Sequence, residues 1–103
     1  MLKQLVSGNE DTFVNKTLYC KNLNDKVNKK DLRVILYELF IQYGTILKII
    51  VKGGCNNRGQ AFVLFDNLNS AIEALNNVNG RVILGKPIVI EYAKKDSKVP
   101  STN

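Results

Sequence analysis

Apolar and polar residues alternate along four short stretches of the chain, at residues 17–22, 47–52, 58–65 and 88–92. Successive side chains of a strand point to opposite faces, so this alternation predicts a sheet with one buried face and one open face. The apolar or small sets are Leu18 and Cys20 in the first strand, Leu47, Ile49 and Val51 in the second, Gly59, Ala61, Val63 and Phe65 in the third, and Ile88, Ile90 and Tyr92 in the last.

Two segments between these strands carry apolar residues at helical spacing. The first begins after Asn28, which can cap a helix together with Asp31, and it ends at Gly44. The second begins after Asn67 and ends at Gly80. The apolar positions are Leu32, Ile35, Leu36, Leu39 and Phe40 in the first helix, and Leu68, Ala71, Ile72, Leu75 and Val78 in the second.

The predicted elements follow in the order strand, helix, strand, strand, helix, strand, with a short extra strand expected at 82–84 before a turn at 85–87. Right-handed crossovers in that order give four antiparallel strands backed by two helices, the α+β ferredoxin-like sandwich. A chain of 103 residues with 45% hydrophobic residues has room for one domain, which we place at residues 17–95. Residues 1–16 are expected to form a flexible leader and residues 96–103 a basic and polar tail.

Composition favours a binding protein with an anionic partner. Fifteen Lys and Arg residues against nine Asp and Glu residues give a net charge of +6, and there is no histidine. Without the commonest general base and zinc ligand, most hydrolytic and metal chemistries are not available, and we expect no metal, cofactor or small-molecule substrate. Cys20 and Cys55 are expected to be reduced thiols. The chain has no membrane-length apolar run and no signal-peptide pattern, which favours a cytosolic or nuclear protein.

Two aromatic residues are predicted to lie on the open face of the sheet. On the third strand Phe62 shares a face with Arg58 and Gln60, and on the first strand Tyr19 shares a face with Lys21. Unpaired bases can stack on exposed rings, each worth roughly 1–3 kcal/mol. The alternative, in which both rings belong to the core, would bury Arg58, Gln60 and Lys21 and is therefore disfavoured.

The first and third strands resemble the two signature stretches of the RNA-recognition motif family, and the resemblance covers about residues 17–95. The third place of the longer signature holds Gln60 where the family pattern has an aromatic residue. Within the family, residues 22–26, 58–63 and 85–97 resemble the spliceosomal A and B″ proteins, which bind hairpins of U1 and U2 small nuclear RNA. Gln60 is itself a trait of that subgroup. The resemblance implies an RNA-binding component of a nuclear ribonucleoprotein that acts in pre-mRNA splicing and has no enzymatic activity.

By position, the resemblance implies a set of residues that contact RNA. Rings would stack with loop bases, amides and a carboxylate would meet base edges, and cations on the rim would meet phosphates. The set consists of Tyr19 and Phe62 for stacking; Asn22, Asp25 and Gln60 for base edges or for organising the loop; Lys26, Lys52 and Arg58 for phosphates or the closing base pair; Glu91, Ala93, Lys94 and Lys95 for further bases; and Lys21 and Ile50 beside them.

Three features depart from the subgroup. Lys21 stands where these proteins commonly have Asn, and Glu91 where they commonly have Gln. The Glu91 carboxylate repels phosphate and cannot donate a hydrogen bond when ionised, so base recognition by the last strand is expected to change. The loop at 53–57 has no charge, which predicts weaker unaided RNA binding than a basic loop would give.

A second candidate surface lies on the first helix, where Val34, Tyr37 and Ile41 fall outside the main apolar stripe. An outer apolar patch suggests a protein partner, although a wide buried stripe with scattered exposed residues is equally compatible with the pattern. In the B″ branch, the resemblance implies a leucine-rich-repeat partner of the U2 A′ type on this side.

Two other functions compete with hairpin binding. The first is an adaptor that uses the RNA-recognition fold only to bind protein through the first helix, with little RNA binding. The second is a small phosphatase with the same element order. The phosphatase is disfavoured, because the loop at 23–27 lacks the glycine and arginine that a phosphate-binding loop needs.

Overall fold

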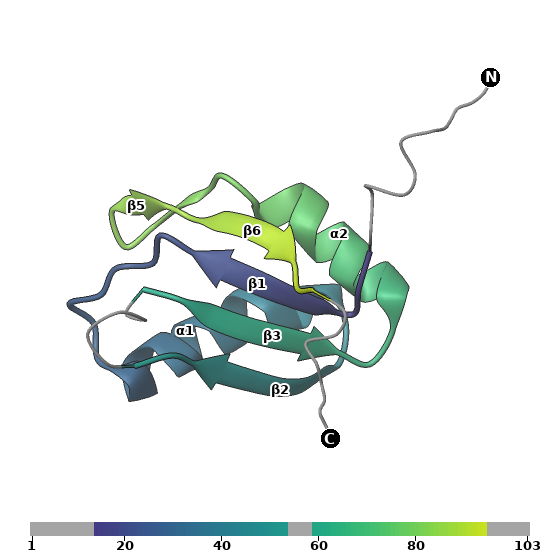
Figure 1. The fold of residues 1–103 in the computed structure, drawn as a ribbon, viewed down its shortest axis with the longest axis horizontal. Coiled ribbons are helices and arrows are strands. Elements are labelled where there is room, and N and C mark those ends of the chain that lie inside the picture. The colour runs from purple at the N-terminus through teal and green to yellow at the C-terminus, as the bar shows by residue number, and fades with distance from the viewer. Residues whose placement is uncertain (1–13, 54–58, 95–103) are drawn as a thin grey trace.

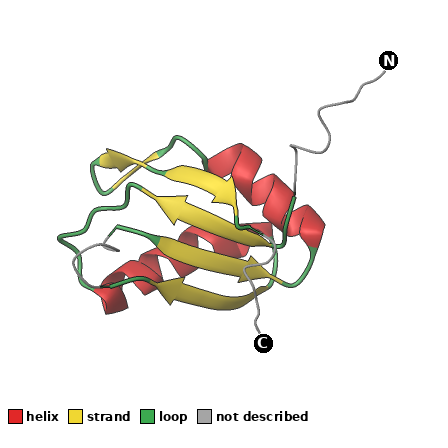
Figure 2. Ribbon diagram, viewed as in Figure 1, coloured by secondary structure: helices red, strands yellow, loops and turns green. Residues whose placement is uncertain are grey.

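The computed structural model describes residues 14–53 and 59–94, and its elements follow the predicted order (Figures 1 and 2). They are β1 (Thr17–Lys21), α1 (Lys29–Phe40), a short 3₁₀ helix η2 (Ile41–Tyr43), β2 (Ile46–Val51), β3 (Ala61–Phe65), α2 (Leu68–Val78), β4 (Val82–Ile83), β5 (Lys86–Pro87) and β6 (Val89–Tyr92). The predicted third strand is thus shorter at its start, and the extra strand at 82–84 forms a small hairpin with β5.

Four strands form one antiparallel sheet in the order β2-β3-β1-β6. Both helices cover the same face of this sheet, and the other face is open (Figures 1 and 2). The predicted α+β ferredoxin-like sandwich is therefore confirmed. The two strands that carry the signature stretches, β1 and β3, lie side by side in the centre of the sheet.

Asparagine caps fix where the helices begin. The Asn28 side-chain oxygen accepts a hydrogen bond of 2.8 Å from the Asp31 backbone N–H, and Asn67 accepts one of 2.9 Å from Ser70. Each bond satisfies one of the N–H groups that the first turn of a helix leaves without a partner. Both predicted starts are confirmed.

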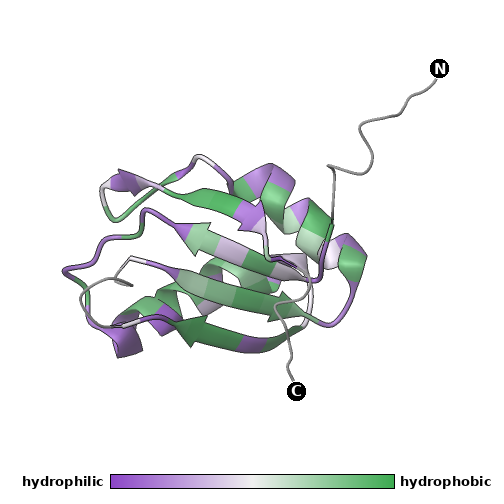
Figure 3. Ribbon diagram, in the orientation of Figure 1, coloured by the Kyte–Doolittle hydropathy of each residue, from purple (hydrophilic) through white to green (hydrophobic). Residues whose placement is uncertain are grey.

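The core lies between the helices and the inner face of the sheet. Phe40 of α1 and Phe65 of β3 are fully buried, with ring centroids 6.2 Å apart at an interplanar angle of 73°. In Figure 3 the strands are mostly hydrophobic and the loops mostly hydrophilic. The buried strand residues are Leu18, Cys20, Val51, Ala61, Val63, Phe65 and Ile90. Their alternation leaves every second side chain of β1 and β3 on the open face.

Two predictions about inward-facing residues are wrong. The side chain of Leu47 is 59% exposed, because the pairing of β2 with β3 shifts register between Ile46 and Lys48. Such a bulge adds a residue to one strand, so Ile46 packs against the core where simple alternation places Leu47. Leu68 is also exposed, because α2 turns Ser70, Ala71, Ala74 and Val78 inward instead.

Candidate nucleic-acid interface

Tyr19 and Phe62 form a ring pair on the open face of the sheet. They are cross-strand partners of β1 and β3, and their sequence neighbours Leu18, Cys20 and Val63 are buried in the core. The ring centroids are 5.0 Å apart and the planes are inclined by 20°. Both side chains are half-buried, so each ring keeps surface that a base could cover. The sheet therefore carries the aromatic platform that the alternation predicts.

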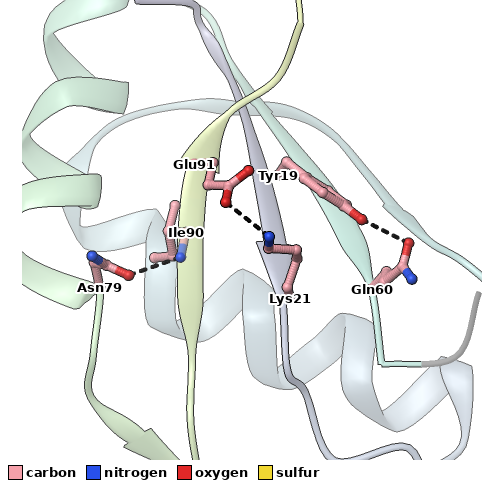
Figure 4. Close-up of polar contacts among 6 residues, drawn as sticks. All are labelled: Tyr19, Lys21, Gln60, Asn79, Ile90 and Glu91. Carbon is pink, nitrogen blue, oxygen red and sulfur yellow. Dashed lines mark hydrogen bonds and ion pairs between the residues drawn. The ribbon is translucent and has the colours of Figure 1, made fainter.

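Polar and apolar groups surround this ring pair. The Tyr19 hydroxyl donates a hydrogen bond of 2.9 Å to Gln60 Oε1, which ties the ring to the start of β3 (Figure 4). Ile50 of β2 is the cross-strand partner of Phe62 and is exposed. The Lys52 ammonium lies 5.8 Å from the Phe62 ring centroid, within the range of a cation–π interaction. Four of the predicted site residues thus gather around Phe62.

On the other side of Tyr19, Lys21 and Glu91 form an ion pair. Lys21 Nζ lies 2.8 Å from Glu91 Oε2 and 5.7 Å from the Tyr19 ring centroid (Figure 4). The hydrogen bond to Glu91 raises the pKa of Lys21 above its ordinary value. Lys21 and Glu91, which the sequence presents as two separate departures, are therefore coupled, because their opposite charges neutralise each other.

The loop after β1 is tied to two neighbouring segments. Asn22 has a left-handed φ of 61°, and its Nδ2 donates to the Pro87 carbonyl over 2.8 Å. Asn24 Nδ2 donates to the Leu84 carbonyl over 3.0 Å, and the Leu23 N–H donates to the Gly59 carbonyl over 3.0 Å. Asn22 therefore organises this loop through its amide nitrogen. Asn24, which the sequence did not single out, does the same.

Asp25 and Lys26 are exposed on that loop. A cavity of about 210 Å³ lies beside this loop, and Asp25 and Lys52 are among the residues that line it. A larger cavity of about 380 Å³ lies between α1 and β2. The smaller cavity brings the predicted rim residues of two different loops to the same end of the sheet. Arg58, Lys95 and Cys55 lie outside the described residues.

Ala93, which follows β6 directly, is hydrogen-bonded through its backbone to other segments of the protein. Its N–H donates 2.9 Å to the Thr17 carbonyl, and its carbonyl accepts a bond of 3.0 Å from Asn15 Nδ2. Ala93 is also buried. These bonds leave only the second lone pair of the carbonyl for a base. The adjacent Lys94 is exposed.

The helical side presents an apolar groove between α1 and β2. Val34 and Tyr37 line it and are 53% and 47% exposed, and Leu47 and Ile49 line it from the strand. Ile41 is exposed at the end of α1 but does not line the groove. The exposure of Leu47 depends on the bulge in β2, which the alternation pattern does not reveal.

The described residues offer little for catalysis or metal binding. Within them there is no group of three or more His, Cys, Asp or Glu side chains that could hold a metal ion. Burial raises the pKa of the Cys20 thiol to about 12, so this group stays protonated and is a poor nucleophile. Over the same ranges, no helix has the length and apolar character needed to cross a bilayer.

A four-stranded sheet with a ring pair on its open face, flanked by amides and ammonium groups, defines a binding module for single-stranded nucleic acid. The chain belongs to the RNA recognition motif family, whose model matches residues 18–89. Domains of this family bind RNA through the sheet, so the predicted class is confirmed.

Curated relatives place the chain in the A and B″ subgroup of that family. It is 42% identical over 85 residues to U1 small nuclear ribonucleoprotein A of Drosophila melanogaster, covering 82% of this chain and 39% of that protein. It is 43% identical over 83 residues to the probable U2 small nuclear ribonucleoprotein B″ of Schizosaccharomyces pombe, covering 81% and 75%. The B″ protein of Dictyostelium discoideum is 42% identical over 87 residues, covering 84% and 36%. The chain thus matches well under half the length of two of these relatives.

Proposed function

We propose that the protein is a nuclear component of a spliceosomal ribonucleoprotein and binds the loop of a U2 small nuclear RNA hairpin through its open sheet face. The U1 hairpin is the second candidate ligand. The observation that carries the proposal is the ring pair of Tyr19 and Phe62, 5.0 Å apart on the face that the helices leave open. Similarity to the B″ proteins of Schizosaccharomyces pombe and Dictyostelium discoideum supports the choice of U2.

Each part of the interface would meet a different part of the loop. Loop bases stack on Tyr19 and Phe62, and Gln60 holds the Tyr19 ring while it offers its amide to a base edge. Lys26, Lys52 and Arg58 meet phosphates or the closing base pair at the rim, and Lys94 and Lys95 meet further bases. Recognition of a hairpin loop in this way needs no chemical step, because affinity comes from stacking, hydrogen bonds and charge.

We also propose that a leucine-rich-repeat protein of the U2 A′ type docks in the groove between α1 and β2. Val34, Tyr37 and Leu47 expose apolar area there, and Arg33, Glu38 and Lys48 supply polar contacts around it. Val34 and Tyr37 belong to α1, which covers one face of the sheet (Figure 1), whereas the ring pair lies on the other face, so the protein partner and the RNA would not compete for the same surface.

Binding of fluorescently labelled U1 and U2 hairpins tests the proposal. Anisotropy titrations at two salt concentrations, each with and without the leucine-rich-repeat protein, would give the four affinities needed for each hairpin. We expect the U2 hairpin to bind more tightly than a hairpin with the same stem and a scrambled loop, and the partner to increase that preference. Equal affinity for the scrambled loop under all conditions would contradict hairpin recognition.

An adaptor that uses only the groove remains the competing function, and the exposure of Val34 and Tyr37 is the observation in its favour. The two functions make opposite predictions for paired variants. If Phe62→Ala leaves RNA affinity unchanged while Val34→Glu abolishes partner capture, the protein is an adaptor. If Phe62→Ala weakens RNA binding, the protein binds the hairpin through its sheet.

A further inference from the structure

The proposed RNA-binding face carries a carboxylate, which is unexpected on a surface that should attract a polyanion. Glu91 lies on β6 directly opposite Tyr19 of β1, and its side chain is 52% exposed. Lys21 lies one position along the open face of β1 and holds Glu91 Oε2 at 2.8 Å (Figure 4). A base that covers Tyr19 therefore has its edge close to both charged groups.

The ion pair with Lys21 reduces the repulsion between the Glu91 carboxylate and the phosphates of RNA. One positive and one negative charge at hydrogen-bond distance have little net field at the distance of a phosphate, so the carboxylate no longer repels the backbone strongly. Both groups keep hydrogen-bonding capacity within the pair. A carboxylate has about four acceptor sites and an ammonium three donors, and their mutual contact uses one of each.

The stability of the fold does not account for this pair. Exposed ion pairs contribute little to folding, because solvent screens them and ordering two long side chains costs entropy. The Lys21 and Glu91 side chains are 37% and 52% exposed, so the pair belongs to that weak class. Its position beside a ring that would stack a base suggests a role in recognition.

We propose that Glu91, neutralised and held in place by Lys21, selects a base with an exocyclic amino group at the Tyr19 position. This inference rests on the proposed function and specifies its ligand. The remaining carboxylate acceptors receive a hydrogen bond from the amino group of cytosine, adenine or guanine, as carboxylates do with the cytosine amino group in DNA complexes. Uracil has carbonyl oxygens at the corresponding edge positions, and these repel the carboxylate. A glutamine there could rotate its amide to accept or donate and would accept uracil equally well.

Deletion of single amino groups from the RNA tests this proposal. In a U2 hairpin, each loop cytosine would be replaced in turn by 2-pyrimidinone, each adenine by purine and each guanine by inosine. These changes remove one amino group each and keep a base that can stack. Affinities would be measured for the natural protein, for Glu91→Gln and for Glu73→Gln, which makes the same change on the exposed surface of α2.

At one loop position we expect the natural protein and Glu73→Gln to lose affinity by roughly tenfold when the amino group is removed, in line with a good base-edge contact. Glu91→Gln should lose less at that position, because a neutral amide oxygen accepts a weaker hydrogen bond from the amino group than a carboxylate does. Lys21→Gln should weaken binding of every hairpin, more so at low salt, because Glu91 is then an unneutralised charge. Thermal unfolding temperatures of the variants should stay within a few degrees of the natural protein.

The proposal is wrong if the amino-group scan gives the same profile for the natural protein and for Glu91→Gln. In that case the proposed function still stands, provided that Phe62→Ala weakens binding of all the hairpins. If the natural protein prefers no hairpin loop over a scrambled one, both the proposed function and this inference fail together.

Discussion

The Tyr19 hydroxyl donates a hydrogen bond of 2.9 Å to Gln60, a residue of the neighbouring strand segment on the same open face. Without this bond, the tyrosine ring could rotate about its side-chain bonds, and stacking of a base would cost the entropy of that rotation. Gln60 thus holds the ring in place before RNA binds. The glutamine that breaks the general family pattern has a structural role next to the platform.

Replacement of Phe62 by alanine should weaken binding of the U2 hairpin by about 1–3 kcal/mol, because one stacking surface is lost. Tyr19→Phe keeps the ring and removes only the bond to Gln60, so its effect should be smaller, at most about 1 kcal/mol. Anisotropy titrations would measure both. Tyr37→Ala removes an exposed ring from α1 and serves as the matched control. Equal affinities of Phe62→Ala and Tyr37→Ala would contradict a stacking role for the sheet.

Lys52→Gln should lower the salt dependence of RNA binding. If its ammonium, which lies beside the Phe62 ring, also meets a phosphate, one fewer counterion is released on binding. The slope of log affinity against log salt should then fall by about 0.7 for a single-stranded loop. Titrations at several salt concentrations would give the slope. Lys30→Gln, on the exposed start of α1, should leave it unchanged; an identical decrease for both variants would mean that only net charge matters.

Val34→Glu should abolish capture of the leucine-rich-repeat protein without changing RNA affinity of the protein alone. The glutamate would bring a charge into the groove that Val34, Tyr37 and Leu47 line, and covering it with an apolar partner surface would cost the hydration of the carboxylate. Pull-down and hairpin titration on the same preparation would separate the two effects. Val82→Glu is the control, because Val82 is also an exposed valine and lies on the β4–β5 hairpin. Partner binding by Val34→Glu at natural strength would exclude the groove as the docking surface.

The sequence was sufficient for the fold because local signals agreed with each other. Caps at Asn28 and Asn67, helical spacing and alternation all predict the same element order, and a ring pair on the open face follows from alternation alone. The bulge in β2 was not predictable, since a register shift depends on how two strands pair and leaves no mark on the periodicity of one.

The sequence names the candidate site residues, but it does not reveal the contacts between them. The hydrogen bond from Asn22 to the Pro87 carbonyl joins two residues 65 positions apart in the chain, so it could not be predicted from local sequence. The pairing of Lys21 with Glu91 likewise required the register of β1 with β6. From residue types alone, Lys21 and Glu91 were two separate departures from the subgroup. In the folded sheet they lie on neighbouring strands and form an ion pair without net charge.

Gly59→Ala should destabilise the fold at the edge of the RNA-binding face. Gly59 has a φ of 75°, and an added Cβ would lie 2.9 Å from the Leu23 carbonyl oxygen, which is backbone and cannot move aside easily. A non-glycine residue in such a conformation costs about 1–3 kcal/mol. Denaturant unfolding would measure the loss. Gly85→Ala has a similar φ of 87° with nothing within 4 Å of the added atom, so it reports the conformational cost alone. The argument for a clash fails if Gly59→Ala is no less stable than Gly85→Ala.

Burial of Cys20 predicts a loss of stability at alkaline pH. Its thiol has an ordinary pKa of 9.0, and desolvation raises the pKa to about 12 in the folded protein. Because the folded pKa is the higher one, the full contribution is present below pH 9.0 and declines as pH rises toward 12, where the folded thiol also ionises. At one pH unit above the unfolded pKa, the free energy of unfolding should have fallen by about 1.4 kcal/mol from this group alone.

Cys20→Ala isolates this contribution, because lysines and tyrosines such as Tyr92, whose pKa is also raised by burial, titrate in both proteins. Urea unfolding at neutral pH and at successive alkaline values would give two curves of stability against pH. The natural protein should start more stable, since alanine leaves a small cavity, and the difference should shrink as the unfolded thiol ionises. A difference that stays constant across this range would mean that the Cys20 thiol ionises equally in the folded and unfolded chains, and hence that solvent reaches the inner face of β1.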